Sequence, residues 1–140
     1  ELELKAVIER KERLVELETM DCLISSDLDE VLPKVSRAVV VEFTSPEATV
    51  EHAHICKRHG NAMVVGTTGL KPDQLAIVED CAKVIPILLA PNMSVGVNVL
   101  LKVLPMLVQM LGPAYDMEMM EIHHGRKKDS PSGTAGCTTR

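Results

Sequence analysis

The side chains best suited to catalysis or ligand binding lie together in residues 121–135, which read E-I-H-H-G-R-K-K-D-S-P-S-G-T-A. Two imidazoles are adjacent there, His123 and His124. Adjacent side chains on a strand point to opposite faces, so we expect these two to have different roles. Histidine titrates near neutral pH and suits proton transfer. Lys127 or Lys128 could donate a proton or neutralise an anion, and the segment therefore predicts acid–base chemistry on an anionic ligand.

The end of this segment predicts an anion site at the start of a helix. Gly133 and Thr134 would offer free backbone N–H groups there, which suit a carboxylate or a phosphate. By spacing alone, however, residues 121–135 are more simply explained as a solvated loop with a basic run. The two interpretations remain open at the level of residue types.

A second cluster could be imagined as a metal site. His52, Cys56 and His59 follow one another at helical spacing. No second group of ligands has a convincing spacing, so we interpret the three as part of an amphipathic helix surface and predict no metal.

Strands and helices alternate along the chain, which predicts an α/β fold with a Rossmann-like, doubly wound parallel sheet. Such sheets bind ligands beyond the carboxyl ends of their strands. The expected strands are residues 1–8, 35–43, 62–65 and 84–89, and the expected helices are residues 46–59 and 72–81. Between the first two strands, residues 9–33 are expected to form a loop with a short helix. The loops of interest are therefore residues 9–10, 44–45, 66–69 and 90–94.

The remaining third predicts the start of a second domain. An apolar helix is expected over 95–111, followed by a strand over 117–123 and a new helix near 132–134. We therefore divide the chain into a nucleotide-binding domain, 1–93, and the start of an α+β substrate-binding and catalytic domain, 94–140. The apolar run 84–111 is broken at Pro91 and is not expected to span a membrane, because a span needs about 20 uninterrupted apolar residues.

Composition narrows the ligand class. The net charge is -5 and the only aromatic residues are Phe43 and Tyr115. Both features argue against a nucleic-acid partner, which calls for positive charge and stacking rings. Between residues 121 and 140 the local charge turns positive, which suits a small anionic ligand. The four scattered cysteines and the lack of a secretory signal pattern favour reduced thiols in the cytoplasm.

Four motifs resemble those of the dihydrodipicolinate reductase family. E-x-H-H-x-x-K-x-D-x-P-S-G-T-A over 121–135 is similar to the family's long signature, residue for residue. Upstream and in the family's order, E-F-T-S-P-E over 42–47 resembles D-F-T-x-P-E. V-G-T-T-G over 65–69 matches the same letters in the family, and A-P-N-M-S-V-G over 90–96 resembles A-P-N-F-S-x-G.

This resemblance implies an NADPH- or NADH-dependent reduction of 4-hydroxy-tetrahydrodipicolinate to tetrahydrodipicolinate in lysine and diaminopimelate synthesis, by a cytoplasmic homotetramer. It implies that His123 and Lys127 supply the proton, and that His124, Ser132, Gly133 and Thr134 hold a cyclic dicarboxylate. The cofactor-binding positions that it implies are Glu9, Arg10, Gly66, Thr67, Thr68, Ala90, Pro91, Asn92 and Met93.

The sequence also departs from the family's pattern. The glycine-rich loop that receives the pyrophosphate of a dinucleotide does not occur in it, and the match ends near Ala135. Met93 stands where the family usually has Phe, and Glu42 where it has Asp. Two other functions therefore stay open: a different nicotinamide-dependent oxidoreductase, and a truncated, non-catalytic module for binding or assembly.

Overall fold

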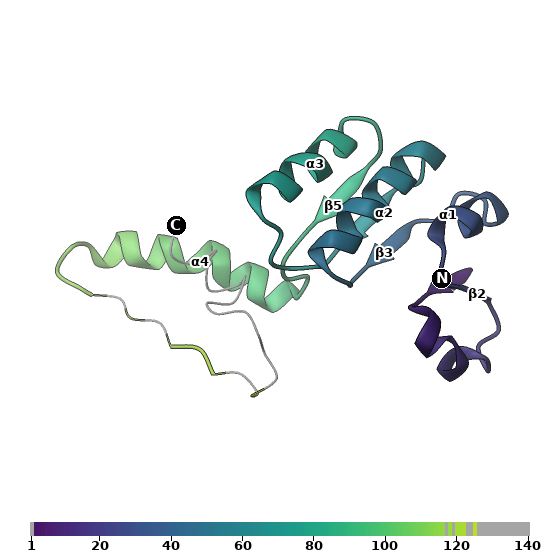
Figure 1. Cartoon of the computed structure of the whole chain (residues 1–140). Coiled ribbons are helices and arrows are strands. Elements are labelled where there is room, and N and C mark those ends of the chain that lie inside the picture. The colour runs from purple at the N-terminus through teal and green to yellow at the C-terminus, as the bar shows by residue number, and fades with distance from the viewer. Residues whose placement is uncertain (1, 117, 119, 123–124, 126–140) are drawn as a thin grey trace.

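All the strands in the described part of the chain are paired in parallel (Figure 1). This computed structural model describes residues 2–116, 118, 120–122 and 125. One sheet joins β1 (Ala6–Ile8) to β2 (Leu23–Ser25), and a second has the order β3 (Val40–Glu42), β4 (Met63–Val65), β5 (Ile87–Leu89). Parallel strands joined by helices confirm the predicted α/β class and its Rossmann-like sheet.

The two helices of the larger sheet lie where their capping signals predicted them. α2 (Pro46–His59) begins after Ser45, whose hydroxyl accepts from the Ala48 N–H, and ends at Gly60 in the left-handed conformation with φ 73°. α3 (Pro72–Ala82) likewise starts with proline in its first turn. Proline needs no N–H donor at that position and glycine adopts positive φ without strain, so both ends are set locally.

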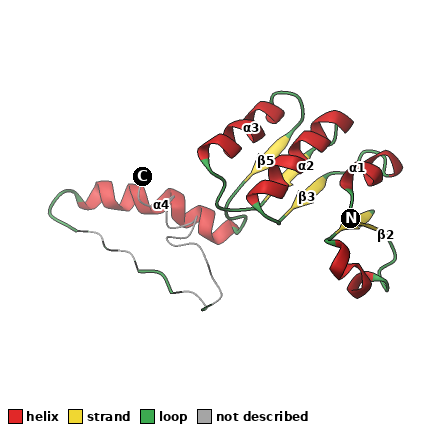
Figure 2. Ribbon diagram, viewed as in Figure 1, coloured by secondary structure: helices red, strands yellow, loops and turns green. Residues whose placement is uncertain are grey.

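Both helices cover the same face of the β3–β4–β5 sheet (Figure 2). Side chains alternate along the strands, and Glu42, Met63 and Val65 point into the covered, buried face. On the opposite face Val41 is 63% exposed and Leu88 57% exposed. The described helices thus supply one of the two layers that a doubly wound sheet has. The buried apolar residues are Leu28, Val31, Leu32, Val35, Ala53, Ile55, Cys56, Met63, Val65, Val78, Cys81 and Ile85.

The strands are shorter than the sequence pattern predicted. β3 starts at Val40 rather than at 35, because Arg37 has a positive φ of 54°, which interrupts an extended backbone. β5 starts at Ile87 rather than at 84, because the Val84 and Ile85 N–H groups both donate to the Cys81 carbonyl at the end of α3. The expected strand over 1–8 is reduced to β1.

The segment expected as a loop with a short helix, 9–33, holds more structure than predicted. It contains the 3-10 helix η1 (Lys11–Leu17), then β2, and then α1 (Leu28–Val31), which runs into η2 (Leu32–Lys34). We missed β2 because its three residues have no alternating pattern of their own; it exists as a strand through its pairing with β1. In Figure 1 this unit lies on the β3 side of the larger sheet.

α4 (Val95–Leu111) matches its predicted bounds and extends away from the sheet (Figure 1). Ser94 caps it by accepting from the Val97 N–H, and Gly112 follows its last residue. None of its residues is buried. Within the described residues, no helix combines the length and apolar character needed to cross a bilayer. Of the expected strand 117–123, the described positions 118 and 120–122 belong to no strand, since none of the described strands pairs with them. The expected helix near 132–134 lies outside the described residues.

Candidate cofactor site

Three of the predicted loops leave the larger sheet at one edge. The Gly66 N–H donates to the Glu42 carbonyl at 2.9 Å, and the Ala90 N–H donates to the Val65 carbonyl at 3.0 Å. Each bond extends the ladder by one residue past a strand's end. The loops after β3, β4 and β5 therefore start side by side at the carboxyl edge, where parallel sheets bind their ligands.

A side chain joins the first two loops. The Thr67 hydroxyl accepts from the Thr44 N–H at 3.0 Å, and Thr67 is buried whereas the next residue, Thr68, is exposed. Thr67 therefore anchors the loop after β4, and Thr68 is exposed on the surface of that loop. Gly66 lies against the Phe43 ring so closely that a Cβ atom there would be 2.0 Å from Cε1 of Phe43. Only glycine allows this approach, which keeps the loop low over the strand ends.

The loop after β5 is tied to the start of α4. The Asn92 side-chain oxygen accepts from the Ser94 N–H at 2.9 Å, and the Asn98 amide donates to the Asn92 carbonyl at 3.0 Å. These bonds fix the turn that carries Ala90 to Met93. Pro91 and Met93 are exposed on it, Met93 with 42% of its surface.

Glu9 and Arg10 directly follow β1 in the smaller sheet. The Glu9 N–H donates to the Ser25 carbonyl at 3.1 Å, and the Glu9 carboxylate accepts from the Arg10 N–H at 2.9 Å. Arg13 pairs with the same carboxylate at 3.4 Å, while the Arg10 side chain remains 71% exposed. The arrangement presents a carboxylate and a guanidinium side by side. No strand in the described part of the chain joins this sheet to the one that carries the other three loops.

The structure also contains a buried ion pair that sequence reasoning missed. Glu42 is 3% exposed, and its Oε2 atom lies 2.6 Å from Nδ1 of His52 on α2. Its Oε1 atom accepts a hydrogen bond from the Thr44 hydroxyl. Burial opposes ionisation of Glu42, but the hydrogen bonds from His52 and Thr44 outweigh it and hold its pKa below the ordinary value. The same hydrogen bond raises the pKa of His52 against the effect of burial. The contact thus favours the ionised form of both groups.

His52, Cys56 and His59, considered above as a possible metal site, do not converge on a common point. His52 bonds to Glu42 and His59 to Asp29, and burial raises the pKa of the Cys56 thiol to about 12, which disfavours a thiolate ligand. Among the residues with a described placement, no three His, Cys, Asp or Glu side chains converge on a point that could hold a metal ion.

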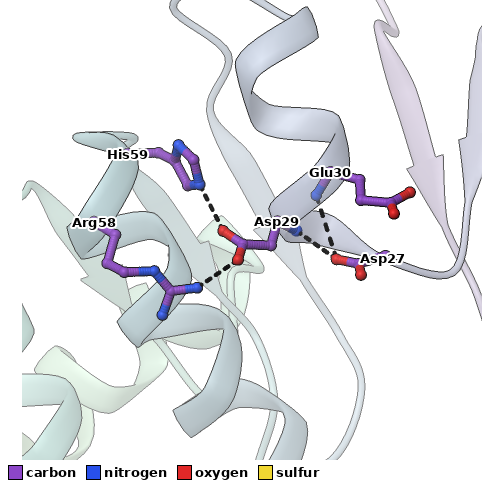
Figure 3. A network of polar contacts seen from close by, with 5 residues as sticks. All are labelled: Asp27, Asp29, Glu30, Arg58 and His59. Carbon is purple, nitrogen blue, oxygen red and sulfur yellow. Dashed lines mark hydrogen bonds and ion pairs between the residues drawn. The ribbon is translucent and has the colours of Figure 1, made fainter.

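His59 takes part instead in a polar cluster between α1 and α2 (Figure 3). Asp29 accepts from Nε2 of His59 at 2.6 Å and from Nη2 of Arg58 at 2.8 Å. These two bonds lower the pKa of Asp29. Asp27 caps α1 through the N–H groups of Asp29 and Glu30. The cluster fastens the segment after β2 to the end of α2.

The other half of the predicted site falls outside the described residues. This holds for His123, His124 and Lys127, and also for Ser132, Gly133 and Thr134. For the cofactor half, the residues present fit parts of a dinucleotide. An acidic–basic pair at a strand end suits a ribose and its phosphate, and close-lying glycine and alanine loops suit a flat ring.

Comparisons with known proteins show the family of this chain. The family model for dihydrodipicolinate reductase, N-terminus, matches residues 1–93, and that for the C-terminus matches residues 96–140. The 4-hydroxy-tetrahydrodipicolinate reductase of Oleidesulfovibrio alaskensis is 54% identical over 96% of the chain, and that of Nitratidesulfovibrio vulgaris strain Miyazaki F is 56% identical over 96%. The chain covers 52% of each, so it spans about half the length of these curated relatives.

A solved structure adds the same likeness in three dimensions. Dipicolinate-bound dihydrodipicolinate reductase from Paenisporosarcina sp. TG-14 matches 97% of this chain with a TM-score of 0.71 and 30% identity, and the chain covers 54% of that protein. The parallel sheet with its strand-end loops defines a Rossmann-like α/β protein. Within that class, the chain belongs to the dihydrodipicolinate reductase family.

Proposed function

We propose that this protein takes part in the NAD(P)H-dependent reduction of 4-hydroxy-tetrahydrodipicolinate to tetrahydrodipicolinate, a cytoplasmic step of lysine and diaminopimelate synthesis. The observation that carries the proposal is the edge at which the loops after β3, β4 and β5 meet, each with the motif that the family has there. The names of the relatives and the dipicolinate bound to the solved neighbour support the substrate class.

The cofactor-binding residues in this proposal lie in the loops after β1, β4 and β5. Glu9 would accept from a ribose hydroxyl, and the exposed Arg10 would pair with a 2′-phosphate where one is present. Gly66 to Thr68 and Ala90 to Met93 would lie along the nicotinamide, which supplies the hydride when bound. Both reduced nucleotides fit this pattern.

The chemistry on the substrate is assigned to residues 121–135. A hydride is added at ring carbon 4 and a proton goes to the hydroxyl that leaves that carbon as water. His123 and Lys127 would hold and deliver the proton. His124, Ser132, Gly133 and Thr134 would bind the two carboxylates, partly through N–H groups at a helix start. The two family models meet between residues 93 and 96, which supports a domain boundary after residue 93.

The test is turnover, followed as loss of the near-ultraviolet absorbance of NADPH or NADH with the condensation product of pyruvate and aspartate semialdehyde. His123→Ala and Lys127→Ala should abolish it. Lys128→Ala is the matched control, because it removes the neighbouring charge at a position without an assigned role, and it should retain most of the rate. Equal loss in both lysine variants would refute the role of Lys127.

A second candidate function is a non-catalytic module for binding or assembly. The exposed apolar surface of α4 and the open sheet face favour it. Nucleotide binding without turnover, in a preparation where a full-length relative is active, would support this alternative over the reductase. Mass measurement of the native complex would show whether four copies associate, as we expect of the reductase.

A further inference from the structure

We propose that the buried Glu42–His52 pair positions the loops after β3 and β4 for the nicotinamide half of the cofactor. Glu42 and His52 act through Thr44 and Thr67 and do not touch the cofactor themselves. The inference depends on the proposed cofactor site and adds two residues to which no role was assigned.

The first step is the pair itself. Glu42 is the last residue of β3, and its side chain points under α2 with both carboxylate oxygens bonded, one to His52 and one to the Thr44 hydroxyl. His52 lies in the second turn of α2 and is largely buried. The carboxylate is thereby fixed between a strand end and a helix.

The second step is the connection between the fixed Glu42 carboxylate and the two loops. Thr44 donates its hydroxyl to Glu42 and its N–H to the Thr67 hydroxyl, so one residue links the carboxylate to the loop after β4. On its backbone side, the Glu42 carbonyl accepts from the Gly66 N–H. Gly66 and Thr67 are thus held from both sides by Glu42, directly and through Thr44.

The third step is that stability alone does not explain why an ion pair is buried at this position. The neighbouring inward side chains Met63 and Val65 are apolar, and apolar residues at such a site stabilise as well as a buried pair does. A charged pair contributes directionality instead, since its hydrogen bonds fix the position of each partner. That property matters where a loop must present its backbone to a flat ring within a fraction of an ångström.

The test compares two halves of the cofactor on the whole chain. Nicotinamide mononucleotide and adenosine 2′,5′-bisphosphate are titrated separately, with binding followed by NMR below the unfolding temperature of every variant. In Glu42→Gln and His52→Gln, we expect nicotinamide mononucleotide to bind about fivefold or more weakly, the order of effect of one ordinary hydrogen bond. Adenosine 2′,5′-bisphosphate, bound at Glu9 and Arg10, should be affected less than twofold.

Two controls separate positioning from general destabilisation. Lys57→Gln breaks the 2.8 Å ion pair between α2 and Asp80 of α3, away from the loops, and should leave both affinities unchanged. Thr44→Val keeps the Glu42–His52 pair but removes the linking hydroxyl, and it should reproduce the selective loss. Without nucleotide, the amide signals of Gly66 and Thr67 should shift in Glu42→Gln and not in Lys57→Gln.

The outcomes are distinct. Equal weakening of both probes, or no weakening in folded Glu42→Gln and His52→Gln, would overturn the positioning role while leaving the cofactor site in place. If the unmodified chain binds neither probe, the proposed cofactor site is refuted and the positioning role is refuted with it.

Discussion

At the scale of single residues, the Glu42–His52 pair should make stability depend on pH. The pKa of His52 is raised above its ordinary 6.5, so the stability it contributes is fully present below pH 6.5 and is lost as the pH rises through the higher folded value. The pKa of Glu42 is lowered from 4.5, so its contribution is present above pH 4.5 and is lost as the pH falls through the lower folded value. Among the facing groups, Glu51 also raises the pKa of His52, and Cys56 remains a thiol.

The predicted result is a stability maximum between these two limits. Urea unfolding should give a free energy that declines above pH 6.5, and His52→Gln should remove that decline. At about pH 6 the variant should be less stable by about 1.5–3 kcal/mol, the contribution of a hydrogen bond between charged groups. A His52→Gln curve parallel to that of the parent would show that the pair does not titrate as a unit.

The contact between Gly66 and Phe43 gives a second prediction. A Cβ at Gly66 would overlap the Phe43 ring, which is 66% exposed, so Gly66→Ala should cost about 0.5–1.5 kcal/mol as the ring is pushed from its rotamer. Phe43→Ala in the same chain should recover most of that loss, because the ring is the obstacle. Gly69→Ala is the control: it has open space but a φ of 81°, so its cost arises from the backbone and should not be recovered by Phe43→Ala. Thermal unfolding of the single variants and of the two double variants checks this.

Sequence reasoning located the loops at this scale but not the bonds that hold them. The motifs around Gly66 and Ala90 were recognised from their letters, and the structure places both at the strand ends. Glu42 was noted only as a motif residue that replaces an aspartate, and His52 only as a rejected metal ligand. Their contact joins a strand to a helix ten residues later, and it depends on how α2 packs over β3, which no local pattern encodes.

At the scale of elements, helices were predicted well and strands poorly for a physical reason. Helices α2 and α4 carry their own boundaries in Ser45 and Ser94 and in the glycines that follow them. The bounds of a strand depend on the strands that it pairs with and on the segment before it. β3 therefore begins after Arg37, and β5 begins after the end of α3, rather than where the apolar runs begin. For the same reason β2 was not anticipated.

The cluster around Asp29 gives a prediction at this scale (Figure 3). Asp29→Asn should weaken the link between α1 and α2, yet change global stability little, because exposed ion pairs contribute little to folding. Local opening should increase more, so amide hydrogen exchange should accelerate in α1 and β2 and not in α3. Arg58→Gln, which removes one of the two partners, should have a smaller effect in the same direction. Uniform acceleration in all elements would contradict a local role.

At the scale of the whole molecule, two extended apolar surfaces of the described residues are exposed. One is the sheet face that carries Val41 and Leu88, opposite the face covered by α2 and α3. The other is α4, on which Val99, Val103, Met106 and Met110 follow at intervals of four, three and four residues and are each at least half exposed. This spacing places them along one stripe, as in helices that pair with other helices. Patches of this kind mark association surfaces in soluble proteins.

We therefore predict that the chain self-associates through α4. Sedimentation velocity should show a mass above that of one chain, rising with concentration over the micromolar range. Val103→Glu and Met106→Glu should each weaken association about tenfold or more, since tenfold requires only ~1.4 kcal/mol and an unpaired buried carboxylate costs more than that. Val108→Glu is the matched control: it makes the same Val-to-Glu change on the opposite side of the same helix and should leave the mass unchanged. If the unmodified chain sediments as a monomer at all concentrations, or if Val108→Glu dissociates it as well as Val103→Glu does, the stripe is not the contact. The open sheet face would then be the next surface to test, with Val41→Glu and Leu88→Glu in the same measurement.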